Sequence, residues 1–358
     1  MYTDLSTLCV TPEVSIRETV CRMDRNRMGI MLVVDAERRL LGLITDGDIR
    51  RAILGNTDFE REVNLLLARK AGTSFAKPIT APATADSATL LDIFQRHSLL
   101  YLPLLDESQR VVGLVSLDEF LPNQALPLQA VVMAGGKGSR LYPLTKDVPK
   151  PMLPVGERPL MERTIARLRE IGIRQVTITT HHQPEKIREH FGNGEGFGVE
   201  VSYVSEDRPL GTAGGLALCA APKETTLVIN GDILTELDFR AMLRFHREHE
   251  ADLTVAVRQY DVKVPYGVVT CDGANVRGLI EKPVYGVFVN AGIYLLEPSA
   301  HRAIPHGQRC DMTELIQRLL DEKRSVVSFP IREYWLDIGE HAEYERAGQD
   351  IRSGKVSV

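Results

Sequence analysis

From Leu128 onwards the sequence alternates between short apolar runs and amphipathic stretches, and this alternation limits the folds that are open to the chain. The first run, Leu128 to Met133, is continuously apolar and ends in glycines, as is typical of a parallel strand buried on both faces. The strands expected after it are Gln175 to Thr180, Val199 to Val204 and Thr226 to Ile229, and the expected helices are Leu160 to Ile171, Glu185 to Phe191, one after Gly211, and Phe239 to Glu248. Such alternation predicts a doubly wound α/β domain. The more β-rich pattern after Asp252 predicts a second lobe inserted on the sheet.

Ahead of this domain, one stretch of sequence occurs twice, 71 residues apart. The stretch from Val34 to Thr45 recurs from Leu105 to Ser116. Each copy predicts two strands joined by a polar turn, a helix ahead of them, and a second helix opened by Thr45 or Ser116. Neither copy can bury enough apolar surface alone, so we expect the two to pack together. Two prolines in residues 122–127 suit a stiff linker, which gives domains at 1–121 and 128–358.

The charge balance argues against two kinds of partner. The chain has 43 Lys and Arg against 48 Asp and Glu, a net charge of -5, spread evenly between its halves. We therefore expect no nucleic acid and no membrane surface as partner. No apolar run approaches the ~20 residues that span a bilayer, and the first residues do not resemble a signal peptide. The five cysteines form no CxxC pair, which favours free thiols in a reducing cytoplasm.

A glycine-rich turn, Ala134-Gly135-Gly136-Lys137-Gly138-Ser139-Arg140, follows the first expected strand. Its glycines let the backbone approach a ligand and direct N–H groups at it, and Lys137 and Arg140 add positive charge, as a triphosphate requires. The spacing fits neither a Walker A loop nor the Rossmann G-x-G-x-x-G. Four prolines from Pro143 to Pro154 then fix an extended path on which Lys150 is held with little mobility.

These residues together resemble the signature of the sugar-1-phosphate nucleotidyltransferases, also called nucleotide-sugar pyrophosphorylases. The matching positions are Gly135-Gly136-x-Gly138-x-Arg140-Leu141-x-Pro143-Leu144-Thr145 and Pro149-Lys150-Pro151. Further matches in family order are Phe191 to Gly194 with Phe197-Gly198, Glu206, Pro209 to Gly215, Asn230-Gly231-Asp232, Tyr266-Gly267, Glu281-Lys282-Pro283, Asn290-Ala291-Gly292 and Trp335 to Gly339. The resemblance covers roughly residues 128–350 and implies a Rossmann-like domain with a mixed sheet.

The resemblance implies that a sugar-1-phosphate oxygen attacks the α-phosphate of a nucleoside triphosphate and releases pyrophosphate. It assigns Mg²⁺ as the cofactor, held by Asp232 and Asp337, although Asp232 could instead belong to a turn or a helix cap. It assigns catalytic roles to Arg140, on the β- and γ-phosphates, and to Lys150, on the α-phosphate.

The resemblance also assigns the residues that bind the two substrates. Those expected at the nucleotide are Ala134, Gly135, Gly136, Gly138, Glu206, Gly211 and Thr212, with Gly215 beside them. Those expected at the sugar phosphate are Gly267, Glu281, Lys282 and Asn290. Glu206 has the alternative of a solvated loop carboxylate. His181 and His182 are interpreted as structural, because the reaction needs no obligatory base.

The N-terminal repeat resembles a pair of CBS domains, a Bateman module. The residues that carry the resemblance are Gly42 to Asp48 and Gly113 to Glu119. In the family's ligand motif a hydroxyl residue meets phosphate at a helix N-terminus, and an Asp three residues later binds ribose. Thr45 and Asp48 fit this motif, whereas the second copy has Glu119 after Ser116. The implied ligand is an adenine or guanine nucleotide, and the alternative is a purely structural dimerisation unit.

Several functions remain open at this level. We favour GTP as the donor, with mannose-, glucosamine- or heptose-1-phosphate, because the Pro209 to Gly215 loop and the Glu281 to Asn290 stretch resemble guanylyltransferases. A CBS pair ahead of this domain also resembles the glucosamine-1-phosphate guanylyltransferases of legionaminic acid synthesis. A uridylyl- or thymidylyltransferase acting on glucose-1-phosphate-type substrates, a non-catalytic nucleotide-sensing subunit and a glycosyltransferase are the alternatives. We expect a homo-oligomer, either a dimer or a tetramer.

Overall fold

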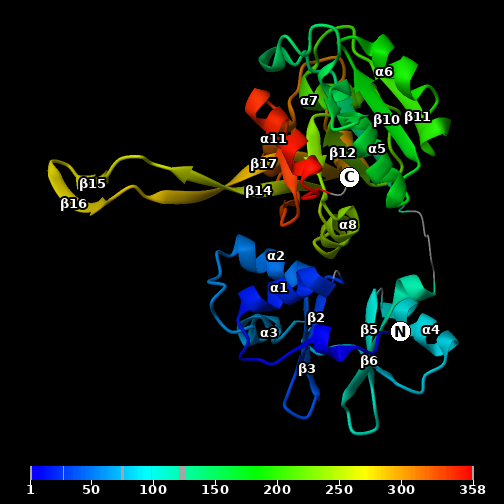
Figure 1. Cartoon of the computed structure of the whole chain (residues 1–358), viewed down its shortest axis with the longest axis vertical. Coiled ribbons are helices and arrows are strands. Elements are labelled where there is room, and N and C mark those ends of the chain that lie inside the picture. The colour runs from blue at the N-terminus through cyan, green and yellow to red at the C-terminus, as the bar shows by residue number, and fades with distance from the viewer. Residues whose placement is uncertain are drawn as a thin grey trace. The chain divides into compact units, whose positions relative to one another are not determined.

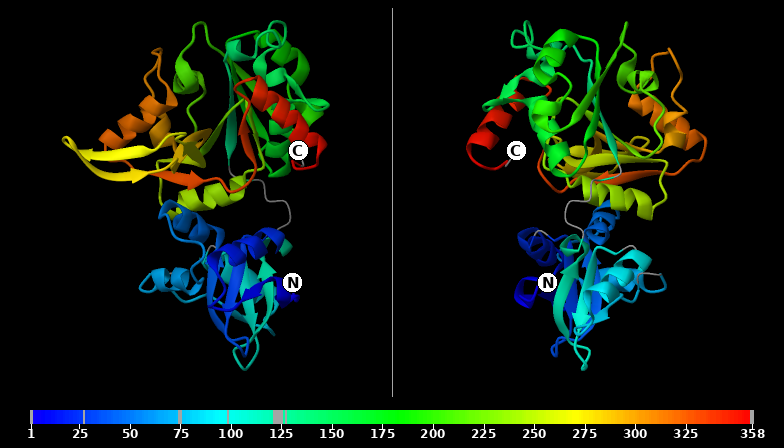
Figure 2. Two further views of the ribbon diagram at one scale, coloured as in Figure 1. Left: turned by 60° about the vertical axis from the view of Figure 1, so that its left-hand side comes forward. Right: turned by 90° about the vertical axis from the view of Figure 1, so that its right-hand side faces the viewer.

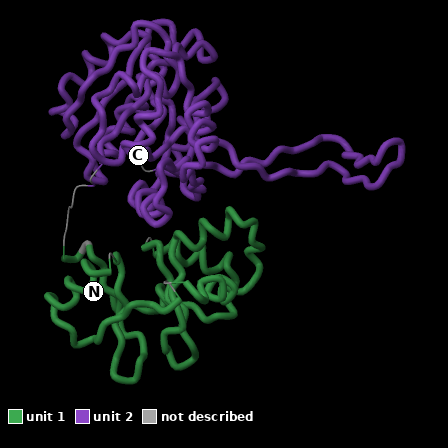
Figure 3. Tube along the Cα trace, turned by 180° about the vertical axis from the view of Figure 1, so that it is seen from behind, with its two compact units in different colours: residues 1–124 green, residues 125–358 purple. Residues whose placement is uncertain are grey.

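The computed structural model describes residues 2–26, 28–73, 76–97, 99–120, 126 and 128–356. It divides into two compact units, unit 1 at Met1–Gln124 and unit 2 at Ala125–Val358 (Figure 3). The linker expected at 122–127 lies, apart from Leu126, outside the described residues. In the part of the chain that is described, no helix is long and apolar enough to cross a membrane.

Unit 1 contains two similar halves, each with a three-stranded sheet. The strands are β1 (Cys9–Val10), β2 (Ile30–Val34) and β3 (Leu40–Thr45) in the first half, and β4 (Ala81–Pro82), β5 (Tyr101–Leu105) and β6 (Val111–Ser116) in the second. The helices are α1 (Ile16–Asn26), α2 (Asp46–Leu54), α3 (Asn64–Lys70) and α4 (Ser87–His97). In each half the first two strands are parallel and the last two form an antiparallel hairpin.

The two halves share a hydrophobic core, as the short repeats led us to expect. Leu32 and Val34 of β2 pack in one buried cluster with Leu105 and Leu114 of the second half. An antiparallel bridge from Tyr2 to Leu114 also joins the halves. The helix expected after Ser116 is a single 3₁₀ turn in the described residues, Leu117–Glu119.

Unit 2 is built on one seven-stranded sheet (Figure 1). Its strands are β7 (Gln129–Ala134), β10 (Gln175–Thr180), β11 (Glu200–Ser205), β12 (Thr226–Asn230), β14 (Leu253–Lys263), β17 (Val284–Leu296) and β18 (Val326–Pro330). The spatial order is β11-β10-β7-β12-β17-β14-β18. β7, β10, β11 and β12 are parallel, and β17 is antiparallel to both of its neighbours, so the sheet is mixed. Central β7 has Ala130, Val131 and Val132 buried, as its continuous apolar run requires.

Helices cover both faces of this sheet (Figure 2). They are α5 (Leu160–Glu170), α6 (Pro184–Phe191), α7 (Gly211–Gly214), α8 (Phe239–Glu248), α9 (Pro298–His301), α10 (Met312–Asp321) and α11 (His341–Arg352). On one face, Val131 and Val228 pack against Leu315 of α10. On the other, Ile229 of β12 lies beside Phe239 of α8. The helix expected after Gly211 is only one turn, α7, continued by a 3₁₀ turn at Gly215–Leu218.

Three further pairs of short strands complete unit 2. They are β8 (Pro154–Val155) with β9 (Arg158–Pro159), β13 (Ile233–Thr235) with β19 (Trp335–Asp337), and β15 (Val268–Asp272) with β16 (Asn275–Ile280). The first pair precedes α5, and the second joins the end of β12 to the segment before α11. The third lies at the tip of a projection formed by β14 and β17.

This projection replaces the second lobe that the β-rich pattern predicted, and that prediction is wrong. β14, β17 and β18 extend the main sheet. β14 and β17 then continue past it, paired from Arg258 with Val289 to Lys263 with Val284. The resulting ribbon projects from the body of unit 2 (Figure 1). We call residues 259–288 the arm.

Candidate active site

The loops that follow the parallel strands meet at one edge of the sheet. The register pairs Ala134 of β7 with Thr180 of β10, and Thr180 with Ser205 of β11. It also pairs Met133 with Asn230 of β12. The carboxyl edge of an open α/β sheet is the usual place for a ligand. The glycine turn, His181, Glu206 and the Gly231-Asp232 pair each begin at this edge.

The glycine turn folds back onto the segment that carries Lys150. Gly138 has φ of +62°, and the Thr145 hydroxyl donates to its carbonyl oxygen at 2.8 Å. A Cβ at Gly138 would lie 2.8 Å from the Thr145 methyl and 3.0 Å from Lys150 Cβ. Only glycine fits this conformation and this approach. Gly136, by contrast, has open space beside it, and Lys137 is exposed.

Lys150 reaches the end of β12 and pairs there with Asp232. The two charged atoms are 2.5 Å apart, and Lys150 is buried. Gly231 makes the approach possible, because its amide donates to the Met133 carbonyl and a Cβ there would lie 3.2 Å from Pro151. The Pro149–Pro151 segment therefore packs directly against the strand end, and Lys150 is held in place as its neighbouring prolines predict.

Asp337 reaches the same place from 105 residues further along the chain. β13 and β19 pair so that Ile233 faces Asp337, and the Ile338 amide donates to the Asp232 carbonyl at 3.0 Å. The Trp335 indole donates to the Ala291 carbonyl at 2.9 Å. Three sequence motifs, at 230–232, 290–292 and 335–339, thus converge at the end of β12.

The two carboxylates influence each other's charge. Burial and the negative charge of Asp232 raise the pKa of Asp337 to about 6, although the cations Lys150 and Arg140 act against the rise. One oxygen of each group, Asp232 Oδ1 and Asp337 Oδ1, is buried with no hydrogen-bond partner in the described part of the chain. Two carboxylate oxygens without partners and with excess negative charge fit a hard divalent cation.

This arrangement fits Mg²⁺ and not a metal that needs a full set of protein ligands. In the chain as described, no group of three or more His, Cys, Asp and Glu side chains could hold a metal ion. Mg²⁺ keeps several waters and is commonly bound by one or two carboxylates plus substrate phosphates. Asp232 and Asp337 would supply those two carboxylates.

Arg140 lies at the exposed side of this group. Its guanidinium is 3.7 Å from Glu340, and a Cβ at Gly339 would lie 3.8 Å from it. Glu340 was not predicted from the sequence, although it follows directly on the Trp335 to Gly339 motif. Glu343, one turn into α11, was also missed; its Oε2 is buried with no hydrogen-bond partner in the described residues, and its charge acts on Asp337.

Glu206 acts within its own loop. The Leu210 amide donates to its Oε2 at 2.9 Å, and a Cβ at Gly215 would lie 2.6 Å from its Oε1. Its backbone carbonyl bonds with the His181 ring. The Glu206 carboxylate therefore contacts its own loop, and its contacts hold the Pro209 to Gly215 segment in place. The bond between the His181 ring and the Glu206 carbonyl agrees with the structural role expected of His181, which stays a prediction.

Gly211 and Thr212 both contact the residues at the start of α10. The Thr212 amide donates to Asp311 Oδ1 at 3.0 Å, and the Thr212 hydroxyl accepts from the Met312 amide at 2.8 Å. Gly211 has φ of +81°, and a Cβ there would lie 2.6 Å from the Cys310 carbonyl. The Thr212 amide is therefore already paired, whereas the Thr212 hydroxyl only accepts in this arrangement and its O–H can still donate to another group.

The residues expected at the sugar phosphate do not all come together. Asn290 lies at the base of the arm, where its side chain accepts from the Gly292 amide at 2.9 Å. A Cβ at Gly292 would lie 2.5 Å from the side chain of Asn230, two residues before Asp232. Gly267, Glu281 and Lys282 lie on the arm. Glu281 and Lys282 have 69% of their side-chain surface exposed. They lie beyond the outer end of β17, and the six residue steps from Asn290 to Val284 span about 20 Å.

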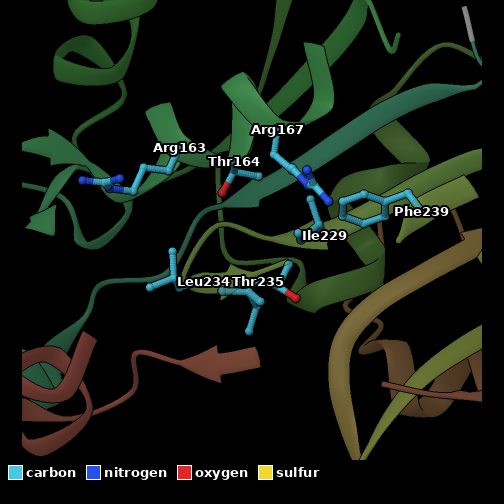
Figure 4. Close-up of a pocket in the computed structure, with 8 residues that line it drawn as sticks. Arg163, Thr164, Arg167, Ile229, Leu234, Thr235 and Phe239 are labelled. Carbon is cyan, nitrogen blue, oxygen red and sulfur yellow. The ribbon is translucent and has the colours of Figure 1, made fainter. Parts of the chain in front are cut away.

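A pocket beneath the site is too small for a substrate. It lies between α5 and α8 and is lined by Thr164, Arg167, Ile229 and Phe239 among others (Figure 4). Its volume is about 10 Å³, which is room for about one water molecule.

In unit 1, Thr45 and Asp48 form a capping box at the start of α2. The Thr45 amide donates to Asp48 Oδ2 at 2.8 Å. Lys70 lies 2.5 Å from the same oxygen, and Arg51 lies 2.7 Å from the other. Burial raises the pKa of Asp48, but Lys70, Thr45 and Arg51 outweigh it and lower that pKa below its usual value. Ser116 and Glu119 form the equivalent box in the second half.

We expect Asp48→Ala to destabilise unit 1 by about 3–5 kcal/mol, because it removes a helix cap and leaves the nearly buried Lys70 ammonium unpaired. Calorimetric unfolding of the whole chain measures this change. Glu37→Ala is the control, since the Arg39–Glu37 pair is 56% exposed on both sides and should be worth under about 1 kcal/mol. Equal stability of the two variants would contradict a structural role for Asp48.

Comparison with protein-family models gives two matches. The model described as Nucleotidyl transferase matches residues 129–354, and the CBS domain model matches residues 4–55 and 74–124. The structure of a Bacillus anthracis protein solved with sucrose, described as a glucose-1-phosphate thymidylyltransferase, superposes with a TM-score of 0.53 at 26% identity. The superposition covers 64% of this chain and 97% of that one.

Two curated proteins are similar to unit 2. Mannose-1-phosphate guanylyltransferase of Mycobacterium tuberculosis is 34% identical over 234 residues, which are 63% of this chain and 65% of that protein. UTP–glucose-1-phosphate uridylyltransferase of Synechocystis is 31% identical over 250 residues, 64% of each. The chain thus spans less than two thirds of the length of these relatives.

Proposed function

The chain belongs to the nucleotidyl transferase family, with CBS domains at its N-terminus, and on that premise we propose that it joins a nucleoside triphosphate to a sugar-1-phosphate. The products would be a nucleoside diphosphate sugar and pyrophosphate. Membership of this family and the mixed α/β fold confirm the resemblance found in the sequence. The observation that carries the proposal is the cluster of Lys150, Asp232 and Asp337 beside the glycine turn.

The chemistry that this cluster can perform is charge neutralisation. A sugar phosphate and a triphosphate repel each other, and transfer between them depends on positioning and electrostatics more than on covalent catalysis. Lys150 is buried and fixed, so its ammonium is oriented before substrate arrives. We propose that it binds the α-phosphate, and that exposed Arg140 binds the β- and γ-phosphates. When bound by Asp232 and Asp337, Mg²⁺ would neutralise phosphate charge.

We propose GTP as the nucleotide and mannose-, glucosamine- or heptose-1-phosphate as the sugar phosphate. The support is the resemblance of the Pro209 to Gly215 loop to that of guanylyltransferases, together with the M. tuberculosis relative of that name at 34% identity. The Synechocystis relative is a uridylyltransferase at 31%. Uridylyl or thymidylyl transfer is therefore the alternative that the experiment must separate.

The test is release of pyrophosphate with Mg²⁺, with GTP, UTP, dTTP, CTP and ATP each offered mannose-, glucose-, glucosamine-, N-acetylglucosamine- and heptose-1-phosphate. The proposal predicts release with GTP and one of the sugars named above. Release with UTP or dTTP alone would overturn the choice of base and keep the reaction. Silence throughout, with ATP and GTP also present as CBS ligands, would favour a non-catalytic nucleotide-sensing subunit.

For unit 1 we propose regulation by an adenine or guanine nucleotide that meets Thr45 and Asp48. Both oxygens of Asp48 already have cationic partners, so a ribose would have to displace them or share them. Regulation also requires that the nucleotide bind two states of the enzyme with different affinity. Calorimetric titration of the whole chain with ATP and with GTP tests the proposal, if the Asp232→Asn variant is used to weaken binding at the candidate active site.

A further inference from the structure

The arm exposes an unusual amount of apolar surface. Of the 18 large apolar side chains that are exposed in the described residues, 11 lie between Tyr260 and Phe288. The most exposed are Tyr266 at 75% and Val276 and Leu279 at 66% each. Single exposed apolar residues are common on protein surfaces, but a large group of them on one element marks an interaction surface.

The geometry of the arm also requires a covering surface. β15 and β16 pair with each other alone within the described residues. A two-stranded ribbon of this kind is marginally stable in water unless something packs on it, and its free edges are templates for pairing. Since the body of unit 2 does not cover the arm (Figure 1), a surface outside unit 2 must do so.

Charge on the arm favours a second copy of this chain over nucleic acid or a membrane. Residues 259–288 carry three anionic and three cationic side chains, Asp261, Asp272 and Glu281 against Lys263, Arg277 and Lys282. A balanced surface does not attract nucleic acid or an anionic membrane. It does suit a two-fold interface, in which the same surface of both copies is in contact. A cationic side chain of one copy can then lie against an anionic side chain of the other, and the reverse.

The amount of apolar surface agrees with a stable interface. Eleven side chains, each about half exposed, offer on the order of 500 Å². A standard interface buries about 800 Å² per partner, of which about 60% is apolar, again about 500 Å². The arm alone therefore supplies the apolar surface that one partner needs.

The candidate active site is incomplete without an arm. Glu281 and Lys282, which the family signature places at the sugar phosphate, lie about 20 Å along the ribbon from Asn290. The ribbon continues the hydrogen-bonded register of β14 and β17, which holds its tip away from its own body. We propose that two copies of this chain associate through their arms, and that each arm carries Glu281 and Lys282 to the sugar-phosphate side of the other copy's site.

The first test is the molecular mass in solution and does not depend on activity. Sedimentation equilibrium of the whole chain is expected to give a multiple of 39.9 kDa. The Val276→Glu and Leu279→Glu double variant is expected to halve that mass with its circular dichroism unchanged. Leu320→Glu is the control, because Leu320 is 48% exposed but lies on α10. A wild-type monomer, or an unchanged mass in the folded arm variant, would overturn the association.

The second test asks which copy supplies Lys282, and it rests on the proposed function. Asp232→Asn and Lys282→Ala chains with different tags are coexpressed, and mixed oligomers carrying both tags are isolated. Each variant alone is expected to lose activity, Lys282→Ala mainly through a higher KM for sugar phosphate. The mixed oligomer should regain up to about half of wild-type turnover, because one body and one arm remain intact in one site.

Mixed oligomers of Asp232→Asn and Asp337→Asn chains are the matched control and should stay inactive, because both changes lie in the body. If the Lys282→Ala mixture stays as inactive as this control, the arm serves its own chain and the proposal fails. Failure of the proposed function would look different, since wild-type protein would then release no pyrophosphate.

Discussion

Asp337→Asn will abolish Mg²⁺-dependent turnover and at the same time make the protein more stable. Burial and Asp232 raise the pKa of Asp337 to about 6, so Asp337 binds a proton more tightly in the folded chain than in the unfolded chain. The stability that this proton provides is complete below the ordinary pKa near 4 and is lost as the pH rises through 6. Asparagine resembles the protonated form at every pH, so the variant keeps that stability at pH 7.5.

The expected gain is modest because Asp337 is only partly buried. After allowance for solvent screening we expect about 1 kcal/mol, or about 2–4 °C in the melting temperature at pH 7.5, and a gain that shrinks towards zero as the pH falls from 7 to 4. Differential scanning calorimetry in chelator measures it. Asp252→Asn is the control and should change stability in the opposite direction. Arg324 and Ser299 lower the pKa of Asp252, so loss of the Asp252 charge should destabilise the protein.

The loss of turnover in Asp337→Asn should be at least about 10²-fold, since the metal supplies several kcal/mol of charge stabilisation in reactions of this kind. Added Mg²⁺ should raise the melting temperature of the wild type more than that of the variant. Full activity in the variant, or a melting temperature below that of the wild type at pH 7.5, would contradict the assignment of Asp337.

Lys150→Met will lower kcat by about 10²–10³-fold, the effect of removing one preorganised charge from a transition state. It will also destabilise the metal-free protein, because Asp232 loses its partner at 2.5 Å and Asp337 loses a cation that lowers its pKa. Mg²⁺ should restore much of that stability and none of the turnover. Thermal unfolding with and without Mg²⁺, beside steady-state kinetics, measures both effects.

Lys146→Met is the matched control for Lys150→Met. Lys146 is exposed and lies four residues earlier on the same segment, so its replacement should change turnover less than about threefold. If both variants were equally active, Lys150 would not be part of the catalytic group. If Lys150→Met were inactive and yet as stable as the wild type in chelator, its pairing with Asp232 would not hold in solution.

Much of the fold was predictable because the central strands of the sheet, β10, β7 and β12, are parallel. Buried parallel strands have near-continuous apolar runs, which the sequence shows most clearly in β7. The strand at Gln175–Thr180 and the helix at Phe239–Glu248 agree residue for residue with the sequence pattern. The arm was not predictable, since β17 is apolar beyond the sheet, from Val284 to Val289, as well as within it, from Ala291 to Leu296. The local sequence pattern predicts that a strand forms, but it does not predict which elements pack against that strand.

The candidate site was predictable in its members and not in its geometry. The glycine turn and Lys150 are close in sequence, and their contact follows from the stiff prolines. Asp232 and Asp337 meet only because β13 pairs with β19, two three-residue strands with no signal of their own. The internal bonds of Glu206 and Thr212 depend on tertiary contacts to Gly215 and to α10, which no short stretch of sequence encodes.

The central claim is that the α-phosphate of a nucleoside triphosphate passes to a sugar-1-phosphate. The most direct measurement follows the label from [α-³²P]GTP, together with unlabelled pyrophosphate, during incubation with mannose-, glucosamine- or heptose-1-phosphate and Mg²⁺. The account predicts that the label enters a nucleoside diphosphate sugar in a one-to-one ratio with pyrophosphate, and that Asp337→Asn protein forms neither. Label that stays in GTP or appears in GDP with release of inorganic phosphate, for every triphosphate and sugar phosphate tried, would contradict it.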